Sequence, residues 1–285
     1  MSEHGGGSPV STMSKTEQPR KSRRYWRAGV AAIFVLGGLA VAALVIAEWR
    51  WRAYVPAPFY TGDAKVWAHR GFTGSGLAEN TTAAFADAFA RGAPGTELDV
   101  FYDVARGRYV VLHDAPRDFG AADLLELDRV FAAIAAPRFY WLDFKNLAEL
   151  SPDEAQRAAQ ALQTLLAARG LAGRVIVEST DARNLAVFAR AGLPTSYWVN
   201  FAPGEAWWRF RVRIFRIRRA VAAGRFTAIS MDYTRYTRHV EESFARMPVH
   251  LFTVNSAQLI ETLVCKPAVR IVLTDTEAFD RRCRP

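Results

Sequence analysis

The chain has 285 residues, of which 51% are hydrophobic and 23% are charged, and its formal net charge is +9. This length accommodates one large domain or two small ones, and the composition is globular apart from one additional apolar segment. The positive charge suits anionic lipid surfaces or phosphate-bearing substrates. No nucleic-acid-binding motif accompanies the charge, so we expect no nucleic acid among the partners.

The N-terminal part combines a basic tail with a long apolar run. Residues 1–27 are rich in Ser, Gly and basic residues, and we expect them to form a disordered tail. Residues 28–47 contain no charged residue and are long enough to cross a bilayer as a helix. A cleaved signal peptide is the alternative, although the run is longer than the usual apolar region of such a peptide. Residues 48–64, with two prolines and several aromatic residues, are expected to form a juxtamembrane linker.

The charges on either side of the apolar run predict its orientation. Six Lys or Arg residues precede the run, whereas only Arg50 and Arg52 follow it closely. The positive-inside rule then leaves the N-terminus in the cytoplasm and residues 65–285 outside it. The sequence therefore predicts a single-pass protein of the cell membrane with an extracytoplasmic domain.

From Lys65 onward, segments typical of strands and of helices alternate. Strands are predicted at 66–69, 96–101, 109–113, 139–144, 174–178, 195–199, 227–231, 250–254 and 270–273. Helices are predicted at 81–91, 121–134, 152–169, 182–190, 205–223, 239–245, 257–263 and in a short tail from 277. This alternation indicates parallel β/α units. Eight units predict an α/β protein with a closed (β/α)8 TIM barrel, in which 109–113 lies beside the second strand; an open doubly wound sheet is the rival fold.

Polar residues follow the predicted strands, where a TIM barrel carries its active site. Glu97 and Asp99 are two residues apart in one strand, so both carboxylates point to the same face. They repel each other unless a proton or cation lies between them, and Mg²⁺ and Ca²⁺ select such oxygen ligands. Asp143, inside the apolar segment FYWLDFKN, would complete a three-carboxylate metal site; an ion pair with Lys145 is the alternative reading.

Two histidines, His69 and His113, also follow short apolar runs. Imidazole donates and accepts protons near neutral pH, so the pair is suited to acid–base catalysis. Arg70 and Lys145 are suited to hold phosphate oxygens, Arg through a planar fork and Lys as a point charge.

The order of these motifs resembles that of the glycerophosphodiester phosphodiesterases, which belong to the phosphatidylinositol-phospholipase-C-like TIM-barrel phosphodiesterases. The resemblance rests on HRG at 69–71, ENT at 79–81 followed by AF, ELDV at 97–100 and VVLHD at 110–114. It covers residues 66–114 closely and extends weakly to Thr274 and Asp275.

The resemblance implies a metal-dependent hydrolysis of glycerophosphodiesters to glycerol phosphate and an alcohol. His69 and His113 would then be the catalytic acid and base, in an order that the sequence does not assign. Glu97, Asp99 and Asp143 would bind Mg²⁺ or Ca²⁺, and Glu178 and Asn255 are further candidates for substrate contacts. The attacking group would be a neighbouring hydroxyl of the substrate, which gives a cyclic phosphate.

Two departures from the family pattern bear on the substrate. Asp143 stands where the family usually has Glu, which is similar to the sphingomyelinase D branch of the superfamily. Only 29 residues separate His113 from Asp143, whereas typical glycerophosphodiesterases insert a capping subdomain there. We therefore expect an open site that can face a lipid headgroup as well as a soluble diester.

The segment 205–223 is rich in arginine and has an apolar stripe at helical spacing, at Phe210, Ile214, Ile217 and Val221. It is either a barrel helix with a solvated basic face or an amphipathic helix that rests on anionic lipid, aided by Trp207 and Trp208.

Three further expectations are local. Asn80 or Thr81 is expected to cap the first barrel helix, so that the ENT motif is structural. Cys265 and Cys283 form a disulfide if the domain is outside the cytoplasm, or remain two unpaired thiols. Besides the leading hypothesis of a glycerophosphodiesterase, two alternatives are a phospholipase D-like enzyme acting on (lyso)phospholipid or sphingolipid headgroups and an inactive barrel that binds lipid.

Overall fold

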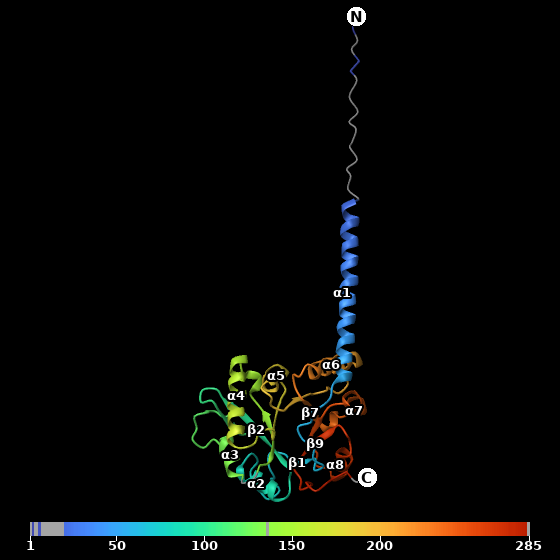
Figure 1. Ribbon diagram of the computed structural model, residues 1–285. Coiled ribbons are helices and arrows are strands. Elements are labelled where there is room, and N and C mark those ends of the chain that lie inside the picture. Colours follow the sequence, from blue (N-terminus) through green and yellow to red (C-terminus); the bar gives the residue numbers. More distant parts are fainter. Residues whose placement is uncertain (1, 3–4, 7–19, 135–136, 284–285) are drawn as a thin grey trace. The chain divides into compact units, whose positions relative to one another are not determined.

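The computed structural model describes residues 2, 5–6, 20–134 and 137–283. It comprises two compact units, Met1–Trp49 and Arg50–Pro285. Helix α1, Arg20–Ala53, begins in the first unit and ends in the second. All the strands lie in the second unit, which we call the barrel unit (Figure 1).

The strands of the barrel unit form one sheet. Its order is β1-β9-β8-β7-β6-β5-β4-β2-β3, and an additional pairing between β1 and β2 closes eight parallel strands into a barrel. The strand bounds are β1 Val66–Ala68, β2 Gly95–Asp103, β3 Arg108–Val111, β4 Phe139–Phe144, β5 Val175–Ser179, β6 Thr195–Trp198, β7 Ala228–Asp232, β8 Val249–Phe252 and β9 Val269–Thr274. The expected TIM barrel is confirmed, and the open doubly wound sheet is not formed.

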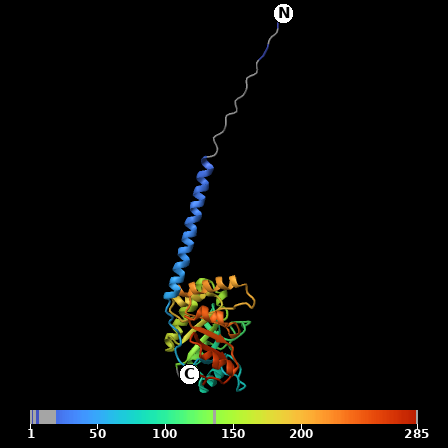
Figure 2. The ribbon, with the colours of Figure 1, turned by 90° about the vertical axis from the view of Figure 1, so that its right-hand side faces the viewer.

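Helices surround the strands, as Figures 1 and 2 show. Their bounds are α2 Thr82–Ala90, α3 Leu127–Ala133, α4 Pro152–Ala168, α5 Ala182–Arg190, α6 Trp207–Ala222, α7 Arg238–Phe244 and α8 Ala257–Val264, with short 3-10 turns η1 Leu147–Glu149 and η2 Tyr233–Arg235. The apolar stripe predicted on α6 packs inward, with Ile214, Ile217 and Val221 buried. Thr81 is the N-cap of α2, since its side chain accepts a hydrogen bond from the backbone N–H of Ala84.

Strand β2 is long enough to pair with two strands on one edge. Its first half pairs with β1, and its second half pairs antiparallel with β3, from Val100 opposite Val111 to Asp103 opposite Arg108. The segment predicted at 109–113 therefore lies beside the second strand, as expected. This hairpin carries His113 to the same end of the barrel as Asp99, because the N–H of Leu112 donates to the carbonyl of Asp99 at 3.1 Å.

Aromatic side chains fill the barrel interior beneath its polar end. Trp67 and Trp141 are fully buried, and Tyr60, from the segment before β1, packs edge-on against Trp67 with ring centroids 5.2 Å apart. Trp141 precedes Asp143 by two residues on the same face of β4, so it lies one layer below that carboxylate. The chain thus closes one end of the barrel with apolar groups and leaves the other for polar chemistry.

Helix α1 is longer than the apolar run from which it was expected. It begins at Arg20 and continues to Ala53, so residues 48–53 are helix and not linker. Lys and Arg are good helix formers, and the helix ends shortly before Pro56. By length and composition, Tyr25–Ala53 is able to cross a membrane, and a signal sequence passes the same test. The rest of the expected disordered tail, residues 1, 3–4 and 7–19, lies outside the described residues.

Two helix predictions were wrong in their extent. The helix expected at 121–134 starts only at Leu127, because the preceding residues pair with β3: the carbonyl of Leu125 accepts a hydrogen bond from Val111, and Glu126 bridges Val110. The tail from 277 forms no helix within the described residues. There Cys283 is tied by a disulfide to Cys265, at the C-terminal end of α8, with 4.7 Å between Cα atoms.

Candidate active site

The sheet register brings the acidic residues together. Asp99 of β2 lies opposite Asp143 of β4, which in turn lies opposite Glu178 of β5, while Glu97 is one layer lower beside Trp141. Adjacent strands are about 4.8 Å apart, so four carboxylates share one end of the barrel. One ligand oxygen each from Glu97, Asp99 and Asp143 lies within 4.8 Å of the others, and all three residues are buried.

The protonation of these acids is strongly perturbed. Burial raises the pKa of Glu97 well above its ordinary value, and the charges of Asp99, Asp143 and Glu178 raise it further. Burial also raises the pKa of Asp143, although the neighbouring Lys145 opposes that shift. The pKa of Glu178 is raised by burial and then by the charge of Asp143. The cluster therefore favours uptake of positive charge, as a proton or a cation.

Two cationic side chains already neutralise part of this charge. Lys145 Nζ lies 2.7 Å from Asp99 Oδ1 and 2.5 Å from Asp143 Oδ2, which agrees with the ion pair considered from the sequence. Arg70 Nε lies 2.9 Å from the other oxygen of Asp99. Two cations among four carboxylates still leave an excess of negative charge.

The remaining donor set fits a divalent metal ion. Glu97 Oε2 is buried and accepts no hydrogen bond from the described residues, and His69 Nε2 is 3.4 Å away from it. Glu178 Oε1 is likewise buried without a hydrogen-bond partner among them, while its second oxygen accepts from Trp141 Nε1 at 3.0 Å. Carboxylate oxygens are the ligands that Mg²⁺ and Ca²⁺ prefer. Glu97, Asp99 and Asp143 are the residues that would hold the ion.

His69 is oriented from both sides of its ring. Its Nδ1 is 2.6 Å from Asp275 Oδ1, just beyond β9, and its Nε2 faces Glu97. The hydrogen bond from His69 lowers the pKa of Asp275, so this carboxylate is ionised at neutral pH. Asn255 holds the other oxygen of Asp275 through Nδ2 at 2.8 Å. Asn255, a candidate for substrate contact from the sequence, thus uses its amide to hold Asp275 in this structure.

Asn80 holds Asp99 in place, a role that the sequence did not reveal. Its Nδ2 donates to Asp99 Oδ2 at 2.7 Å, and its Oδ1 accepts from the Asp99 backbone N–H at 3.1 Å. Asn80 and Arg70 are both in the left-handed region, with φ of 55° and 53°. Such backbone conformations persist where surrounding contacts fix them, and they concentrate at functional sites. The ENT motif, which is expected to be structural, therefore also supplies a buried partner of Asp99, one of the candidate metal ligands.

Gly71 completes the HRG turn for steric reasons. Its φ is +84°, and a Cβ placed there would lie 2.7 Å from the Cβ of Ala84 in α2. Only glycine lets the turn pack against that helix, and the turn sets the direction of His69 and Arg70.

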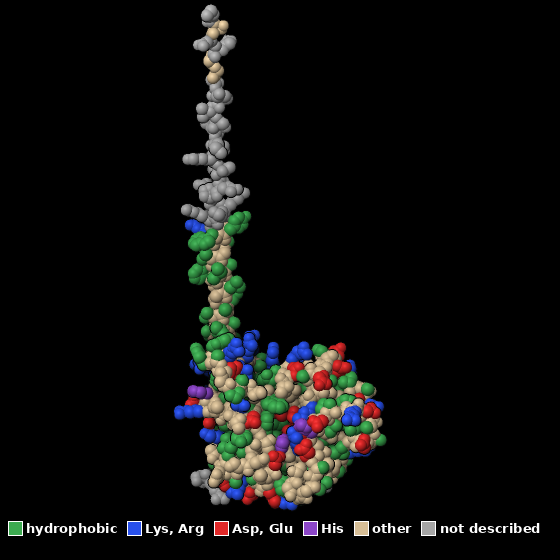
Figure 3. Space-filling view, turned by 180° about the vertical axis from the view of Figure 1, so that it is seen from behind, with side chains coloured by type: hydrophobic (Ala, Val, Ile, Leu, Met, Phe, Trp, Pro, Cys, Tyr) green, Lys and Arg blue, Asp and Glu red, His purple; other side chains and the backbone are tan. Residues whose placement is uncertain are grey.

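His113 is the more exposed of the two histidines. Its side chain is 41% exposed, against 18% for His69, and its Nδ1 is 2.9 Å from Asp114 Oδ1. Between β3 and β4 the described residues form only a single bridge at Glu126, the short helix α3 and loops. Figure 3 shows histidine side chains beside acidic and basic ones on one face of the barrel unit. The expectation of a site without a capping subdomain agrees with this part of the structure.

No known family profile matches the sequence, and no curated protein sequence matches it. Solved structures do. A glycerophosphodiester phosphodiesterase from Thermotoga maritima is 20% identical with a TM-score of 0.56, covering 77% of this chain and 97% of its own. One from Parabacteroides distasonis is 20% identical with a TM-score of 0.54, covering 74% of this chain and 92% of its own.

The chain has the fold of the glycerophosphodiester phosphodiesterases. A third similar structure is an Oleispira antarctica phosphodiesterase in complex with the product sn-glycerol-3-phosphate; it is 17% identical with a TM-score of 0.52, and the match covers 76% of this chain and 94% of its own. At these identities the likeness establishes the barrel architecture, and the chemistry has to be argued from the site.

Proposed function

We propose that the protein is a metal-dependent phosphodiesterase that hydrolyses glycerophosphodiesters to glycerol phosphate and an alcohol. The observation that carries the proposal is the meeting of Glu97, Asp99 and Asp143 within 4.8 Å, with His69 Nε2 directed at Glu97. The barrel fold shared with solved glycerophosphodiester phosphodiesterases supports it. Mg²⁺ or Ca²⁺ is the proposed cofactor, since the ligands are oxygen atoms.

In the proposed mechanism, Arg70 and Lys145 orient the substrate phosphate beside the carboxylates. When bound, a divalent cation would neutralise charge on the phosphate and favour attack at phosphorus. The Asp275 carboxylate accepts a hydrogen bond from the N–H at His69 Nδ1, which leaves Nε2 as the proton acceptor. We assign His69 as the base that takes the proton of the attacking hydroxyl. His113 is then the acid that protonates the leaving alcohol.

The attacking hydroxyl, by resemblance to the family, is a neighbouring hydroxyl of the substrate. It forms a new P–O bond while the P–O bond to the alcohol breaks, and water then opens the cyclic phosphate. Glu178 lies in the same row as Asp99 and Asp143, and its carboxylate accepts a hydrogen bond from the Trp141 indole. We propose that Glu178 either adds to the negative charge that attracts the cation or contacts the substrate when it binds.

The test is choline release from glycerophosphocholine after chelation and addition of Mg²⁺ or Ca²⁺. His69→Ala is expected to lower kcat by roughly 10²–10⁴-fold, the usual contribution of acid–base catalysis. Glu97→Gln alters one of the proposed metal ligands. Glu149→Gln, which alters an exposed carboxylate on η1 in the same way, is its control. If His69→Ala remains fully active, the assigned chemistry is wrong; if the unaltered protein is inactive with every metal, an inactive lipid-binding barrel becomes the better account.

We also propose that residues within Tyr25–Ala53 anchor the protein in the cell membrane, with the N-terminus in the cytoplasm and the barrel unit outside. The excess of basic residues before the apolar run supports this orientation. The disulfide between Cys265 and Cys283 supports an oxidising compartment. Protease added to intact cells should remove the barrel unit; protection of the barrel until the cells are permeabilised would reverse the orientation.

A further inference from the structure

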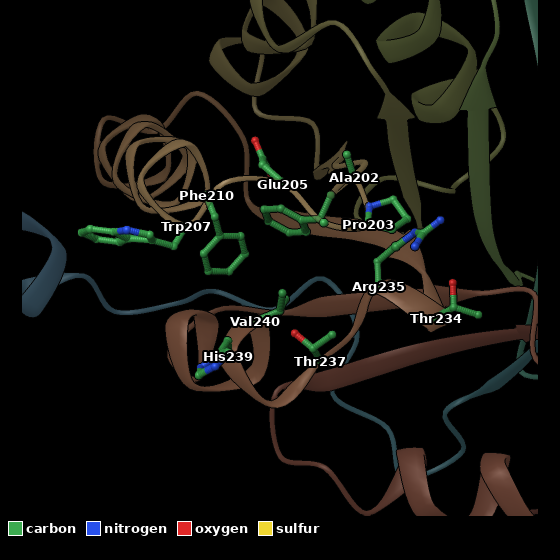
Figure 4. A pocket seen from close by; sticks show the side chains of 12 residues that line it. Ala202, Pro203, Glu205, Trp207, Phe210, Thr234, Arg235, Thr237, His239 and Val240 are labelled. Carbon is green, nitrogen blue, oxygen red and sulfur yellow. The ribbon is translucent and has the colours of Figure 1, made fainter.

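We propose that a groove between α6 and α7 binds the hydrocarbon chain of a lipid phosphodiester, which makes a single-chain lysophospholipid the preferred substrate class. This inference rests on the proposed phosphodiesterase function. It starts from a cavity of about 360 Å³ lined mostly by apolar groups. Figure 4 shows the Phe210 ring of α6 directed toward Val240 of α7, with the Trp207 indole farther out at the edge of the cavity. A volume of this size with an apolar lining is typical of a ligand pocket.

One end of the groove lies close to the polar end of the barrel. Phe201 in its wall is three residues beyond Trp198, the last residue of β6. Extended residues span at most about 3.6 Å each, so Phe201 is within roughly 11 Å of that strand end. Thr234 is two residues beyond the end of β7, within roughly 7 Å of it by the same measure.

Aromatic rings also lie between the end of β6 and the carboxylates. The rings of Trp198 and Phe252 are 5.3 Å apart, and both side chains are partly exposed. Phe252 also contacts Trp141 at 6.2 Å, and the Trp141 indole donates to Glu178. A phosphodiester in the proposed active site would therefore have an apolar surface on the side that leads to the groove.

The groove continues along both helices to the start of the barrel unit. A second hollow of about 370 Å³ shares Trp207, Phe210 and His239 with the first and reaches Arg211 and Arg218. The guanidinium of Arg218 lies 5.2 Å from the ring centroid of Trp51, at the C-terminal end of α1. Trp51 is the second residue of the barrel unit, where the chain enters from the candidate membrane span. The groove thus runs from the first residues of the barrel unit toward the ends of β6 and β7.

The exposed groups along the groove fit a lipid better than a soluble diester. The Trp207 side chain is 76% exposed, although it is large and apolar. Exposed aromatic groups beside arginines are typical of surfaces that contact anionic lipid headgroups. A polar glycerol headgroup would gain little from contact with this apolar surface. An acyl chain bound there would remove the surface from water.

In the proposed reaction with lysophosphatidylcholine, the overall change is the addition of water across one P–O bond. The bond from phosphorus to the choline oxygen breaks, a P–O bond to the water oxygen remains in the product, and the proton goes to the choline oxygen. The products are choline and a lysophosphatidate. Glycerophosphocholine undergoes the same change without a chain, so it is the matched substrate.

The test uses the full chain in phosphatidylcholine nanodiscs and compares choline release from lysophosphatidylcholine and glycerophosphocholine. Trp207→Ala is expected to lower kcat/KM for the lysolipid about tenfold, as loss of roughly 55 Å² of apolar contact implies at about 25 cal/mol per Å². Its kcat/KM for glycerophosphocholine should not change. Ala202→Trp, which narrows the cavity, should act in the same direction. Val212→Ala, an exposed apolar residue of α6 outside the groove, should alter neither value.

The outcomes separate this inference from the proposed function. Equal losses on both substrates, or turnover of glycerophosphocholine with none of the lysolipid, would overturn the groove assignment and leave the phosphodiesterase in place. If neither substrate is cleaved, the proposed function fails. Lysophosphatidylcholine binding to the chelator-treated protein, measured by calorimetry, then decides the groove: binding lost in Trp207→Ala supports it, and no binding shows that the groove serves another occupant.

Discussion

At the residue scale, Asp99 is the centre of the proposed site. It is fully buried, and its carboxylate contacts Arg70, Asn80 and Lys145. A buried carboxylate is costly unless it is paired and hydrogen-bonded, so each of these groups offsets part of the cost of burying Asp99. Substitution of one of these partners should therefore disturb the geometry of Asp99 more than a substitution disturbs a surface ion pair.

Asn80→Ala is expected to lower the free energy of unfolding by roughly 2–4 kcal/mol, because it removes one hydrogen bond to a charged group and one to the backbone. Asn80→Gly loses the same bonds but avoids the left-handed penalty of about 1–2 kcal/mol, so it should be the more stable variant. Asn184→Ala is the control, since Asn184 is equally buried and holds the carbonyls of Leu147 and Leu150. Urea unfolding and glycerophosphocholine turnover measure both effects. Loss of activity in the control as well would mean that Asn80 acts only through stability.

His250 predicts a pH dependence of stability. Burial lowers the pKa of His250 to about 3, from an ordinary value of 6.5. Below pH 6.5 the unfolded chain binds a proton that the folded chain refuses until about pH 3, so this contribution is complete above pH 6.5 and declines as pH falls. Between pH 8 and pH 5 the loss is about 2 kcal/mol. Denaturant unfolding of His250→Gln should show a correspondingly smaller difference between these pH values; an unchanged difference would contradict the assignment.

At the scale of elements, the strands set the positions of the acidic side chains, and the loops supply the residues that hydrogen-bond to the site. The register from β2 through β4 to β5 aligns Asp99, Asp143 and Glu178 in one row. The groups that orient the site come from loops instead: Asn80, before α2, holds Asp99, and Asp275, after β9, holds His69. Active sites of barrels are built in this way because rigid strands carry variable loops.

The disulfide between Cys265 and Cys283 fastens the C-terminal segment to α8. The two residues are 18 apart in sequence, and closing a loop of that length stabilises a folded chain by about 3 kcal/mol through the unfolded state. Cys283→Ser is expected to lose about that much free energy of unfolding. Reductant should destabilise the unaltered chain to the same extent and leave the variant unchanged. A variant as stable as the oxidised chain would show that this crosslink constrains little.

At the scale of the whole molecule, the barrel concentrates negative charge at one end and depends on cations to balance it. A ligand that binds only the folded chain adds RT ln(1 + [L]/Kd) of stability, about 2.7 kcal/mol at a hundred times Kd. Mg²⁺ or Ca²⁺ should therefore raise Tm after chelation. Asp143→Asn should abolish that response without lowering the stability of the chelated form, because the raised pKa of Asp143 already favours a neutral group. Glu149→Gln should keep the response. A Tm that is insensitive to chelation and metal would argue against the metal site.

The sequence by itself determined the architecture and the end of the barrel at which the candidate site lies. The nine predicted strands correspond to the nine strands that the described residues form, and the spacing of Glu97 and Asp99 placed both carboxylates inside the barrel. Such features depend on the local spacing of apolar and polar residues, which can be read from each short segment of the sequence. The cap at Thr81 could be predicted for the same reason, as one of two candidates.

Only the tertiary structure decided which distant residues meet. Asn80 reaches Asp99 across 19 residues and His69 reaches Asp275 across 206, and no local pattern encodes either contact. The late start of α3 has the same origin, since pairing with β3 overrides the helical preference of the residues before Leu127. The groove between α6 and α7 likewise exists only because two helices with ordinary apolar stripes pack side by side and leave part of their aromatic surface uncovered.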